Sequence, residues 1–303
     1  MTPADRLGGV RIAVLADVHG NLPALEAVLA DVAAQAVDRV IVNGDLANRG
    51  PDTGAVFDLL ADRLDDATLG NHDDLMLIAT GRRGPPDNQW LEDPFWGTVA
   101  WSAAQLKAGG YLEVIERLPM TIKVEEQGAP SLLFSHGSPR HYREGYGADL
   151  TPEVISEITE SHPADVLVGS HTHRPHLLRW GRYTVINTGA VGCPFNGDPR
   201  AHYLTLTLGG GEWVPDFRRV PYDREAALDR VRSSGMLEHT GLSATIFFEE
   251  LKYASSFLVP FLMWCETDKR DKTPANWEEY RKRFEVRFRE PESPRAVRSS
   301  RQP

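Results

Sequence analysis

Carboxylate, amide and imidazole side chains recur in short motifs along the first two thirds of the chain. They are Asp17, His19, Asp45, Asn71, His72, His136, His171 and His173. Oxygen and nitrogen ligands of these kinds suit borderline divalent metals such as Mn, Fe, Co, Ni or Zn. Seven of these residues could be direct ligands, which is too many for one ion and about right for two. The residue types therefore indicate a site for a pair of metal ions.

The spacing of the motifs indicates loops. His171 and His173 stand two residues apart, as do Asp17 and His19. This spacing cannot share a helix face but works on an extended segment or a loop. Each motif could arise by chance in isolation. Their occurrence together, in one chain and each after an apolar run, favours a common site.

The apolar runs that precede the motifs are short and often β-branched. They span residues 12–16, 40–42, 67–69, 132–134, 166–168 and 185–186. Short apolar runs bounded by glycine are typical of buried strands. Ligands of α/β sheets lie beyond the carboxyl ends of the strands, so six such strands would deliver their polar groups to one crevice.

Helical segments fill some of the gaps between these strands. Residues 22–36 and 53–64 are amphipathic, and Thr151 is a candidate N-cap for a third helix. Such crossover helices suit a layered α/β domain. The aromatic-rich segment 82–118 is a candidate cap beside the site, although its aromatic residues could equally be core. From residue 223 onward the pattern is helical.

Composition limits the possible partners. The net charge of −10 argues against binding of long nucleic acids, which requires clustered Lys and Arg. It does not exclude a small phosphate substrate, because bound metals can reverse the local field. Two cysteines offer no CxxC-type zinc cage. No apolar run reaches roughly 18 residues and no signal peptide is evident, so we expect a cytoplasmic protein that does not insert into membranes.

The motifs resemble those of the calcineurin-like metallophosphoesterases. That family has the pattern DxH, GD, GNH(D/E), a single His after a strand, and GHxH. Here the pattern reads Asp17-Val18-His19, Gly44-Asp45, Gly70-Asn71-His72-Asp73, His136 and Gly169-Ser170-His171-Thr172-His173, with Ser170 as an extra residue in the last motif. The stretch 186–192, with Asp198-Pro199-Arg200 after it, is similar to the small bacterial and archaeal phosphodiesterase branch.

The resemblance implies a four-layer α/β/β/α sandwich of two mixed sheets, followed here by a C-terminal helical extension. It covers roughly residues 10 to 220. We therefore expect a metallophosphoesterase domain over 1–220, with 82–118 as its cap or insert. A helical extension over 221–290 and a disordered tail over 291–303 would follow, and a homo-oligomer could form through the extension.

Carried over to this chain, the resemblance implies two sets of ligands. Asp17, His19, Asp45 and His173 would bind one metal, and Asp45, Asn71, His136 and His171 would bind the other. Asp45 would bridge the two ions. His72 would be the catalytic residue, placed near the leaving group as general acid or transition-state donor.

Three further residues are candidates for substrate contact. Arg49 resembles the arginine of the GDxxDRG motif of serine/threonine phosphoprotein phosphatases and could grip a phosphate with its planar fork; the alternative is a surface arginine. Asn71 and Arg200 complete the candidate substrate-binding set. Asn48 stands where phosphoprotein phosphatases have an aspartate that orients the histidine, which weakens an assignment to that group.

The resulting functional prediction is a two-metal phosphoesterase. It would hydrolyse a small phosphate ester, possibly a nucleotide and preferably a diester, by attack of metal-activated water. A phosphomonoesterase or phosphoprotein phosphatase is the first alternative. An inactive scaffold with the same fold is an alternative of another class, and the presence of His72 with all seven ligand candidates argues against it.

Overall fold

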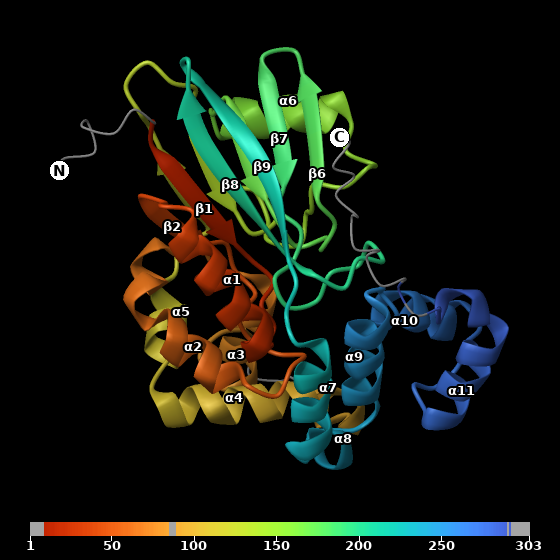
Figure 1. Cartoon of the computed structure of the whole chain (residues 1–303). Helices are drawn as coiled ribbons and strands as arrows, with labels where there is room; N and C mark the ends of the chain where they lie inside the picture. The colour runs from red at the N-terminus through yellow and green to blue at the C-terminus, as the bar shows by residue number, and fades with distance from the viewer. Residues whose placement is uncertain (1–8, 85–88, 290, 292–303) are drawn as a thin grey trace, which may run out of the picture.

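The computed structural model describes residues 9–84, 89–289 and 291, which form two mixed β-sheets flanked by helices (Figure 1). The strands are β1 (Arg11–Leu15), β2 (Arg39–Val42), β3 (Thr121–Val124), β4 (Leu132–Ser135), β5 (Val166–Gly169), β6 (His176–Trp180), β7 (Tyr183–Asn187), β8 (Ala201–Gly209) and β9 (Glu212–Val220). The predicted fold class, a sandwich of two mixed sheets with helices outside and a C-terminal helical region, is confirmed. The predicted disordered tail lies outside the described residues, apart from residue 291.

Parallel and antiparallel pairs are combined in both sheets. The strand orders are β2-β1-β8-β9 and β3-β4-β5-β7-β6. β1 pairs parallel with β2 and antiparallel with β8, while β4, β5 and β7 are mutually parallel. Figure 1 shows β1 and β7 running toward the same end of the sandwich. The loops that leave these strands at their carboxyl ends therefore meet, which is the arrangement needed for one site.

The alternating faces of the strands create separate cores. In β1, Ile12 and Val14 point between the sheets, where they pack with Phe134 and Ile186 of the second sheet. Leu15 points to the opposite face, against the helices that cover the first sheet. This alternation is the period of two that strand geometry imposes. Because both faces of β1 are buried after Arg11, its sequence is apolar from Ile12 to Leu15, as the predicted buried strand requires.

Helices cover the outer faces of both sheets. Those that share a hydrophobic core with the first sheet are α1 (Leu22–Ala34), α2 (Thr53–Leu60), α3 (Asn71–Ala79), α4 (Gly97–Gly109) and α5 (Leu112–Arg117). α6 (Pro152–Ser161) packs on the second sheet through Ile155 and Ile158. α1 begins as predicted and ends two residues early. The predicted helix over 53–64 is divided into α2 and a 3-10 helix over Ala61–Asp66.

One of the six predicted strands was wrong. Residues 67–69 form no strand, and only an isolated parallel bridge joins Ala67 to Val42. The backbone N–H of Leu69 donates to the carbonyl of Pro119, outside both sheets. Helix α3 begins at Asn71, so no residues remain to extend the pairing. The segment still delivers Asn71 and His72 to the common end of the sandwich.

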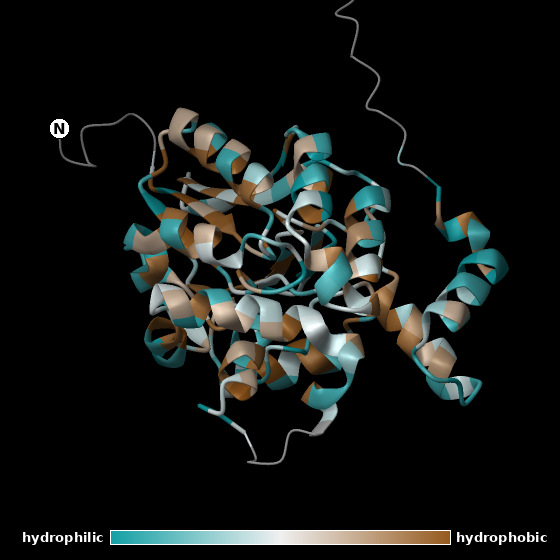
Figure 2. Ribbon diagram, turned by 90° about the horizontal axis from the view of Figure 1, so that it is seen from below, coloured by the Kyte–Doolittle hydropathy of each residue, from teal (hydrophilic) through white to brown (hydrophobic). Residues whose placement is uncertain are grey.

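The C-terminal region is helical, with α7 (Arg224–Ser233), α8 (Met236–His239), α9 (Leu242–Tyr253), α10 (Leu258–Thr267) and α11 (Pro274–Arg283). Aromatic residues of α9 to α11, including Phe261 and Trp277, form a small core that also takes in Phe95. Figure 2 shows the hydrophobic residues of α10 between the main body and α11. Whether this region is a separate unit, or joins two copies of the chain, stays a prediction.

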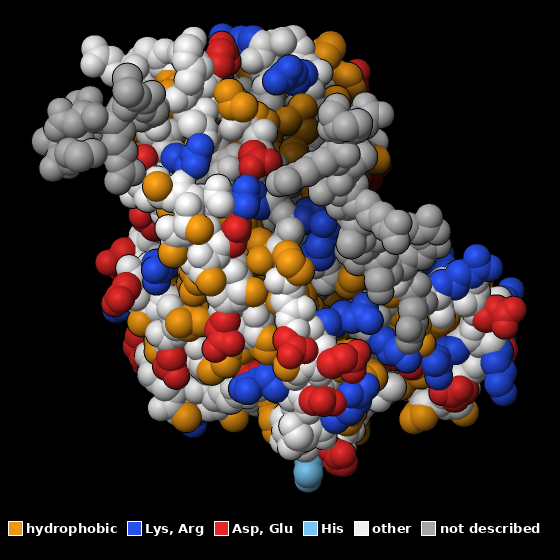
Figure 3. Space-filling view, in the orientation of Figure 1, with side chains coloured by type: hydrophobic (Ala, Val, Ile, Leu, Met, Phe, Trp, Pro, Cys, Tyr) orange, Lys and Arg blue, Asp and Glu red, His pale blue; other side chains and the backbone are white. Residues whose placement is uncertain are grey.

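Two observations concern the partners considered above, namely long nucleic acids and membranes. In Figure 3, basic and acidic side chains are interspersed over the C-terminal helices on the visible face. Among the described residues, no helix is both long and apolar enough to span a bilayer.

Candidate metal centre

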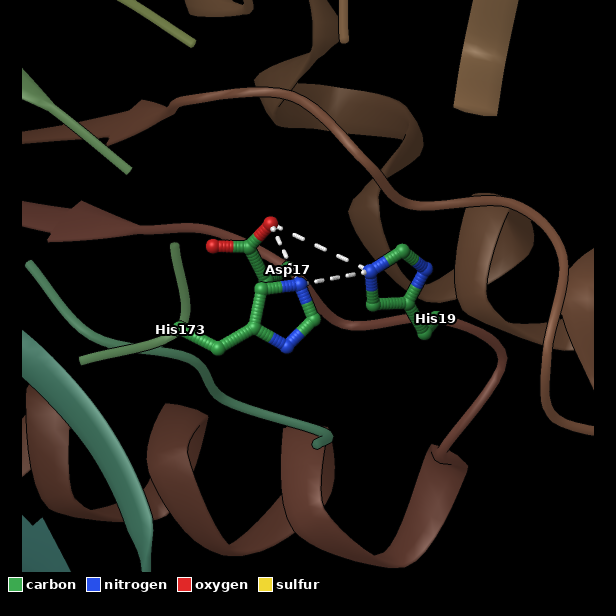
Figure 4. Close-up of side chains that lie close together, drawn as sticks. All are labelled: Asp17, His19 and His173. Atoms are coloured by element: carbon green, nitrogen blue, oxygen red, sulfur yellow. Dashed lines mark hydrogen bonds and ion pairs between the residues drawn. The ribbon is translucent and has the colours of Figure 1, made fainter. Parts of the chain in front are cut away.

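The loops at the common end of the two sheets bring all seven predicted ligands together. Asp17, His19 and His173 form one group, in which each offers a ligand atom within 4.8 Å of the others. The Nε2 atom of His173 lies 3.3 Å from Oδ1 of Asp17 and 3.2 Å from Nε2 of His19. Figure 4 shows the carboxylate and the two imidazoles facing one another. Residues 154 positions apart thus share one buried pocket.

A second group lies beside the first and is linked to it by Asp45. Asp45, His136 and His171 offer ligand atoms within 4.8 Å of one another. Nε2 of His136 lies 3.2 Å from Oδ2 of Asp45 and 3.2 Å from the side-chain oxygen of Asn71. The same Asp45 oxygen lies 3.6 Å from Nε2 of His19, in the first group. Asp45 is therefore placed between the groups, where a bridging carboxylate would stand.

Backbone carbonyls fix the orientation of three imidazoles. Nδ1 of His19 lies 3.1 Å from the carbonyl oxygen of Ala47. Nδ1 of His136 lies 2.9 Å from the carbonyl oxygen of Asn43, and Nδ1 of His173 lies 2.5 Å from that of Cys193. A carbonyl only accepts, so each Nδ1 carries a proton and donates it. In its neutral form, which metal binding requires, each ring then presents the lone pair of Nε2 to the centre. This is the usual way in which histidine ligands are oriented.

The centre contains buried acceptor atoms without donors. Oδ1 of Asp17 and Oδ2 of Asp45 are buried and accept no hydrogen bond. They face imidazole nitrogens that also offer lone pairs, and an unpaired buried carboxylate oxygen is costly. Cations between these atoms would satisfy both kinds of acceptor. The residues thus fit a pair of divalent metal ions, and the buried His/Asp clusters are consistent with a dinuclear site.

Burial and neighbouring charges shift the pKa values of imidazoles in the centre. Burial lowers the pKa of the His136 imidazole, but the negative charges and hydrogen bonding of its neighbours, Asp45 above all and then Asp17, together outweigh burial and raise that pKa to about 10. Burial, followed by the charge of Arg49, lowers the pKa of His19 well below its ordinary value. Adjacent acids and imidazoles therefore differ sharply in proton affinity, which is common at functional sites.

His72 differs from the other histidines of the centre. Its Nδ1 lies 2.9 Å from the amide nitrogen of Asn48, while the side-chain oxygen of Asn48 accepts from the backbone N–H of Arg49. The amide group must therefore donate to Nδ1 of His72, and the neutral ring carries its proton on Nε2. Although His72 lies near His19 and Asp45, a protonated Nε2 cannot bind a metal. It can donate a hydrogen bond.

Much of the centre has left-handed backbone. Of the ten non-glycine residues with positive φ in the described chain, seven belong to these loops: Asp17, His19, Asp45, Asn48, Arg49, His171 and His173. Asp, Asn and His tolerate this region better than other residues, and strain of this kind concentrates at functional sites. The left-handed turns allow side chains two residues apart to converge on one point.

Asp73 was quoted in the sequence motif, but no role was predicted for it. Its carboxylate accepts four backbone hydrogen bonds, from Asp45, Leu46, Ala47 and Gly70, at 2.8 to 3.2 Å. It therefore holds the loop that carries Asp45. Gly70 makes this approach possible, since a Cβ there would lie 2.2 Å from the backbone nitrogen of Asp45. The acidic fourth position of the GNHD motif was the available signal.

Arg49 is not a surface arginine. Its side chain is only 10% exposed and forms an ion pair with the buried Glu250 of α9. Its guanidinium also lies over the rings of Phe195 and Phe247. Glu250 was not predicted, because it stands 201 residues away and belongs to no motif.

Arg200 lies outside this arrangement. Its guanidinium pairs with the carboxylate of Asp198 at 2.6 Å. The predicted contact of Arg200 with a substrate stays a prediction.

Comparisons with known proteins agree with this geometry. The family model of the calcineurin-like phosphoesterases matches residues 10–175. The chain is 26% identical over 247 residues to the uncharacterized protein MJ0912 of Methanocaldococcus jannaschii, covering 76% of this chain and 95% of that protein.

Two solved structures are similar. One is a metallophosphoesterase from Sphaerobacter thermophilus, with 26% identity, a TM-score of 0.63, and coverage of 81% of this chain and 99% of that one. The other is the hypothetical protein PH1004 from Pyrococcus horikoshii OT3, with 18% identity, a TM-score of 0.66, and coverage of 82% and 100%; at this identity it supports the fold alone.

Proposed function

The chain belongs to the calcineurin-like phosphoesterase family, and on this premise we propose that it is a two-metal hydrolase of a small phosphodiester. The observation that carries the proposal is the pair of buried carboxylate oxygens, on Asp17 and Asp45, that face imidazole nitrogens and accept no hydrogen bond. A protein that had lost its metals in evolution would be under no pressure to keep these acceptors together, since burying them is costly.

The proposed ligand sets follow the two groups. Asp17, His19, Asp45 and His173 would hold one divalent cation, and Asp45, Asn71, His136 and His171 would hold the other. The Nε2 geometry of three histidines and the position of Asp45 between the groups support this division. Mn, Fe, Co, Ni and Zn all accept such ligands.

The chemistry divides between the metals and the chain. Two divalent cations bound there would activate a water molecule and neutralise charge on the phosphate oxygens. His72, held by Asn48, donates its Nε2–H to the departing ester oxygen. A neutral imidazole is a weak acid, so this group acts as a hydrogen-bond donor. Arg49 lies at the edge of the same centre. The guanidinium N–H groups that do not pair with Glu250 orient the phosphate.

A metal-reconstitution assay tests the proposal. The protein is stripped of metal and loaded with each of the five ions in turn. Turnover of bis-p-nitrophenyl phosphate, p-nitrophenyl phosphate and a phosphopeptide is then compared. The proposal predicts that the diester is hydrolysed best. Turnover of the monoester alone would overturn the diester assignment, and preference for the phosphopeptide would indicate a phosphoprotein phosphatase. A protein that binds two metals and turns over none of the three would be an inactive scaffold.

A further inference from the structure

A cavity of about 710 Å³ opens directly beside the metal centre. Its inner end is formed by Arg49, Asn71, His72 and His171. Arg143 adds a second positive charge, and none of the described residues that line the cavity is acidic. This end therefore suits the anionic phosphate of a substrate.

The rest of the wall is apolar and comes from three separate parts of the chain. The lining residues are Leu75 and Ile78 of α3, Trp90 and Trp96 of the segment before α4, and Leu258, Val259 and Leu262 of α10. Trp90 is 41% exposed and Val259 is 54% exposed, so the wall presents apolar surface to water beside a polar site. Binding of an apolar group would remove this surface from water.

The wall contributed by α10 is anchored to the centre. Glu250 accepts hydrogen bonds from the backbone N–H groups of Phe257 and Leu258, at 2.7 and 2.8 Å, while it pairs with Arg49. One carboxylate thus joins the start of α10 to the arginine at the inner end of the cavity. The apolar wall is therefore held in place before a ligand binds. A preorganised pocket binds more tightly, because little conformational entropy is lost in ordering its wall.

The lining also argues against recognition of a nucleobase. Reading a base requires several hydrogen-bond donors and acceptors placed around its edge. Among the described residues of the apolar wall, only the indole N–H groups of Trp90 and Trp96 are polar. The two indoles pack edge to face with centroids 5.8 Å apart, so they offer apolar ring surface.

Resting on the proposed function, we propose that the substrate is a phosphodiester with a bulky apolar ester group, alkyl or aryl, which binds in this cavity beside His72. The phosphate lies at the metal end, and the apolar group extends between α3, α10 and the two tryptophans. Among small phosphodiesters, the proposal thus selects those that carry an apolar organic group. It disfavours nucleotides as substrates.

A series of phosphonates tests this assignment. Methyl-, butyl-, hexyl- and phenylphosphonate are used as competitive inhibitors of bis-p-nitrophenyl phosphate turnover, with thymidine 5′-phosphorothioate as the polar planar probe. Burial of each methylene should tighten the inhibition constant about fourfold until the cavity is filled. Comparison of the hexyl and phenyl probes distinguishes an alkyl from an aryl group. Equal inhibition across the series, or tightest binding of the thymidine probe, would overturn the proposal.

Two positions on α10 give a matched pair of variants. Val259 lines the cavity, while Met263, one turn away and 62% exposed, does not. Val259→Asn should weaken hexylphosphonate at least tenfold and leave methylphosphonate within twofold. Met263→Asn should change neither. Equal behaviour of the two variants would contradict the assignment.

Direct titration calorimetry separates the two proposals. If no phosphoester is turned over but hexylphosphonate binds the metal-loaded protein more tightly than methylphosphonate, the proposed reaction fails and the apolar site stands. If the diester is turned over and chain length has no effect on affinity, the reaction stands and the apolar site fails.

Discussion

Replacing Glu250 by glutamine should destabilise the protein far more than an ordinary change on a helix. The Glu250 side chain is fully buried, and it serves Arg49 with one oxygen and the start of α10 with the other. In Glu250→Gln the amide oxygen can still accept from the N–H groups of Phe257 and Leu258. The amide nitrogen then faces the guanidinium of Arg49, donor against donor, and the buried positive charge has lost its partner.

The expected cost follows from the burial of both side chains. Removing one partner of a buried ion pair costs about 3–5 kcal/mol, because an uncompensated charge remains inside. The Arg49 side chain is 10% exposed, so partial hydration places the cost near the lower limit, about 3 kcal/mol. Replacing both partners, in Arg49→Met/Glu250→Gln, removes the stranded charge. The double variant should therefore lose only about 1 kcal/mol.

Urea unfolding followed by tryptophan fluorescence measures these differences. The matched control is Glu249→Gln, the neighbouring residue on α9, whose partner Arg281 is 33% exposed. A partly hydrated pair contributes little, so this variant should lose less than about 1 kcal/mol. If Glu250→Gln cost no more than Glu249→Gln, or if the effects of the Arg49 and Glu250 changes were additive, the account of this pair would be refuted.

Three further predictions concern the loops of the centre and the surface. His72→Ala should keep both metals but lower kcat about 10²–10³-fold, since one transition-state donor is lost; metal analysis and turnover together check this. Asp73→Asn should lower metal affinity about 10–100-fold, because one acceptor oxygen becomes an NH2 group that faces backbone N–H donors of the loop that carries Asp45; a chelator competition titration measures it. The hydrogen bonds of Arg218 lower the pKa of Asp31, so their stabilisation is present above about pH 3.9 and is lost as the pH falls below it. Asp31→Asn should cost about 0.5–1 kcal/mol at pH 7, and urea unfolding should show that difference vanish in acid.

The parts of the site that are local in sequence could be predicted. Each ligand motif directly follows an apolar run. Because the carboxyl ends of parallel strands lie at the same end of a sheet, motifs that follow such strands come together in space. The strand over 67–69 was predicted wrongly because apolar character alone does not reveal that a helix starts at Asn71. Strands β3 and β6 were missed, because at Thr121–Val124 and His176–Trp180 polar residues interrupt the apolar pattern.

The parts that depend on distant contacts could not be predicted. Arg49 and Glu250 are 201 residues apart, and no periodicity connects them. The apolar wall of the cavity is contributed by α10, whose residues gave no functional signal in the sequence. The four backbone donors around Asp73 depend on the exact path of the Asp45 loop, which left-handed residues determine. Such features follow from tertiary packing and from backbone conformations that residue type permits but does not require.

The metal content of the protein and of one variant tests the central claim most directly. After stripping and reloading, plasma mass spectrometry should find two divalent metal ions per chain in the wild type and in Asp31→Asn, which lies away from the centre. Asp45→Ala should bind neither ion tightly, because the Asp45 carboxylate lies between the two groups, 3.2 Å from Nε2 of His136 and 3.6 Å from Nε2 of His19. One ion or none in the wild type, or two in a folded Asp45→Ala protein, would contradict the account.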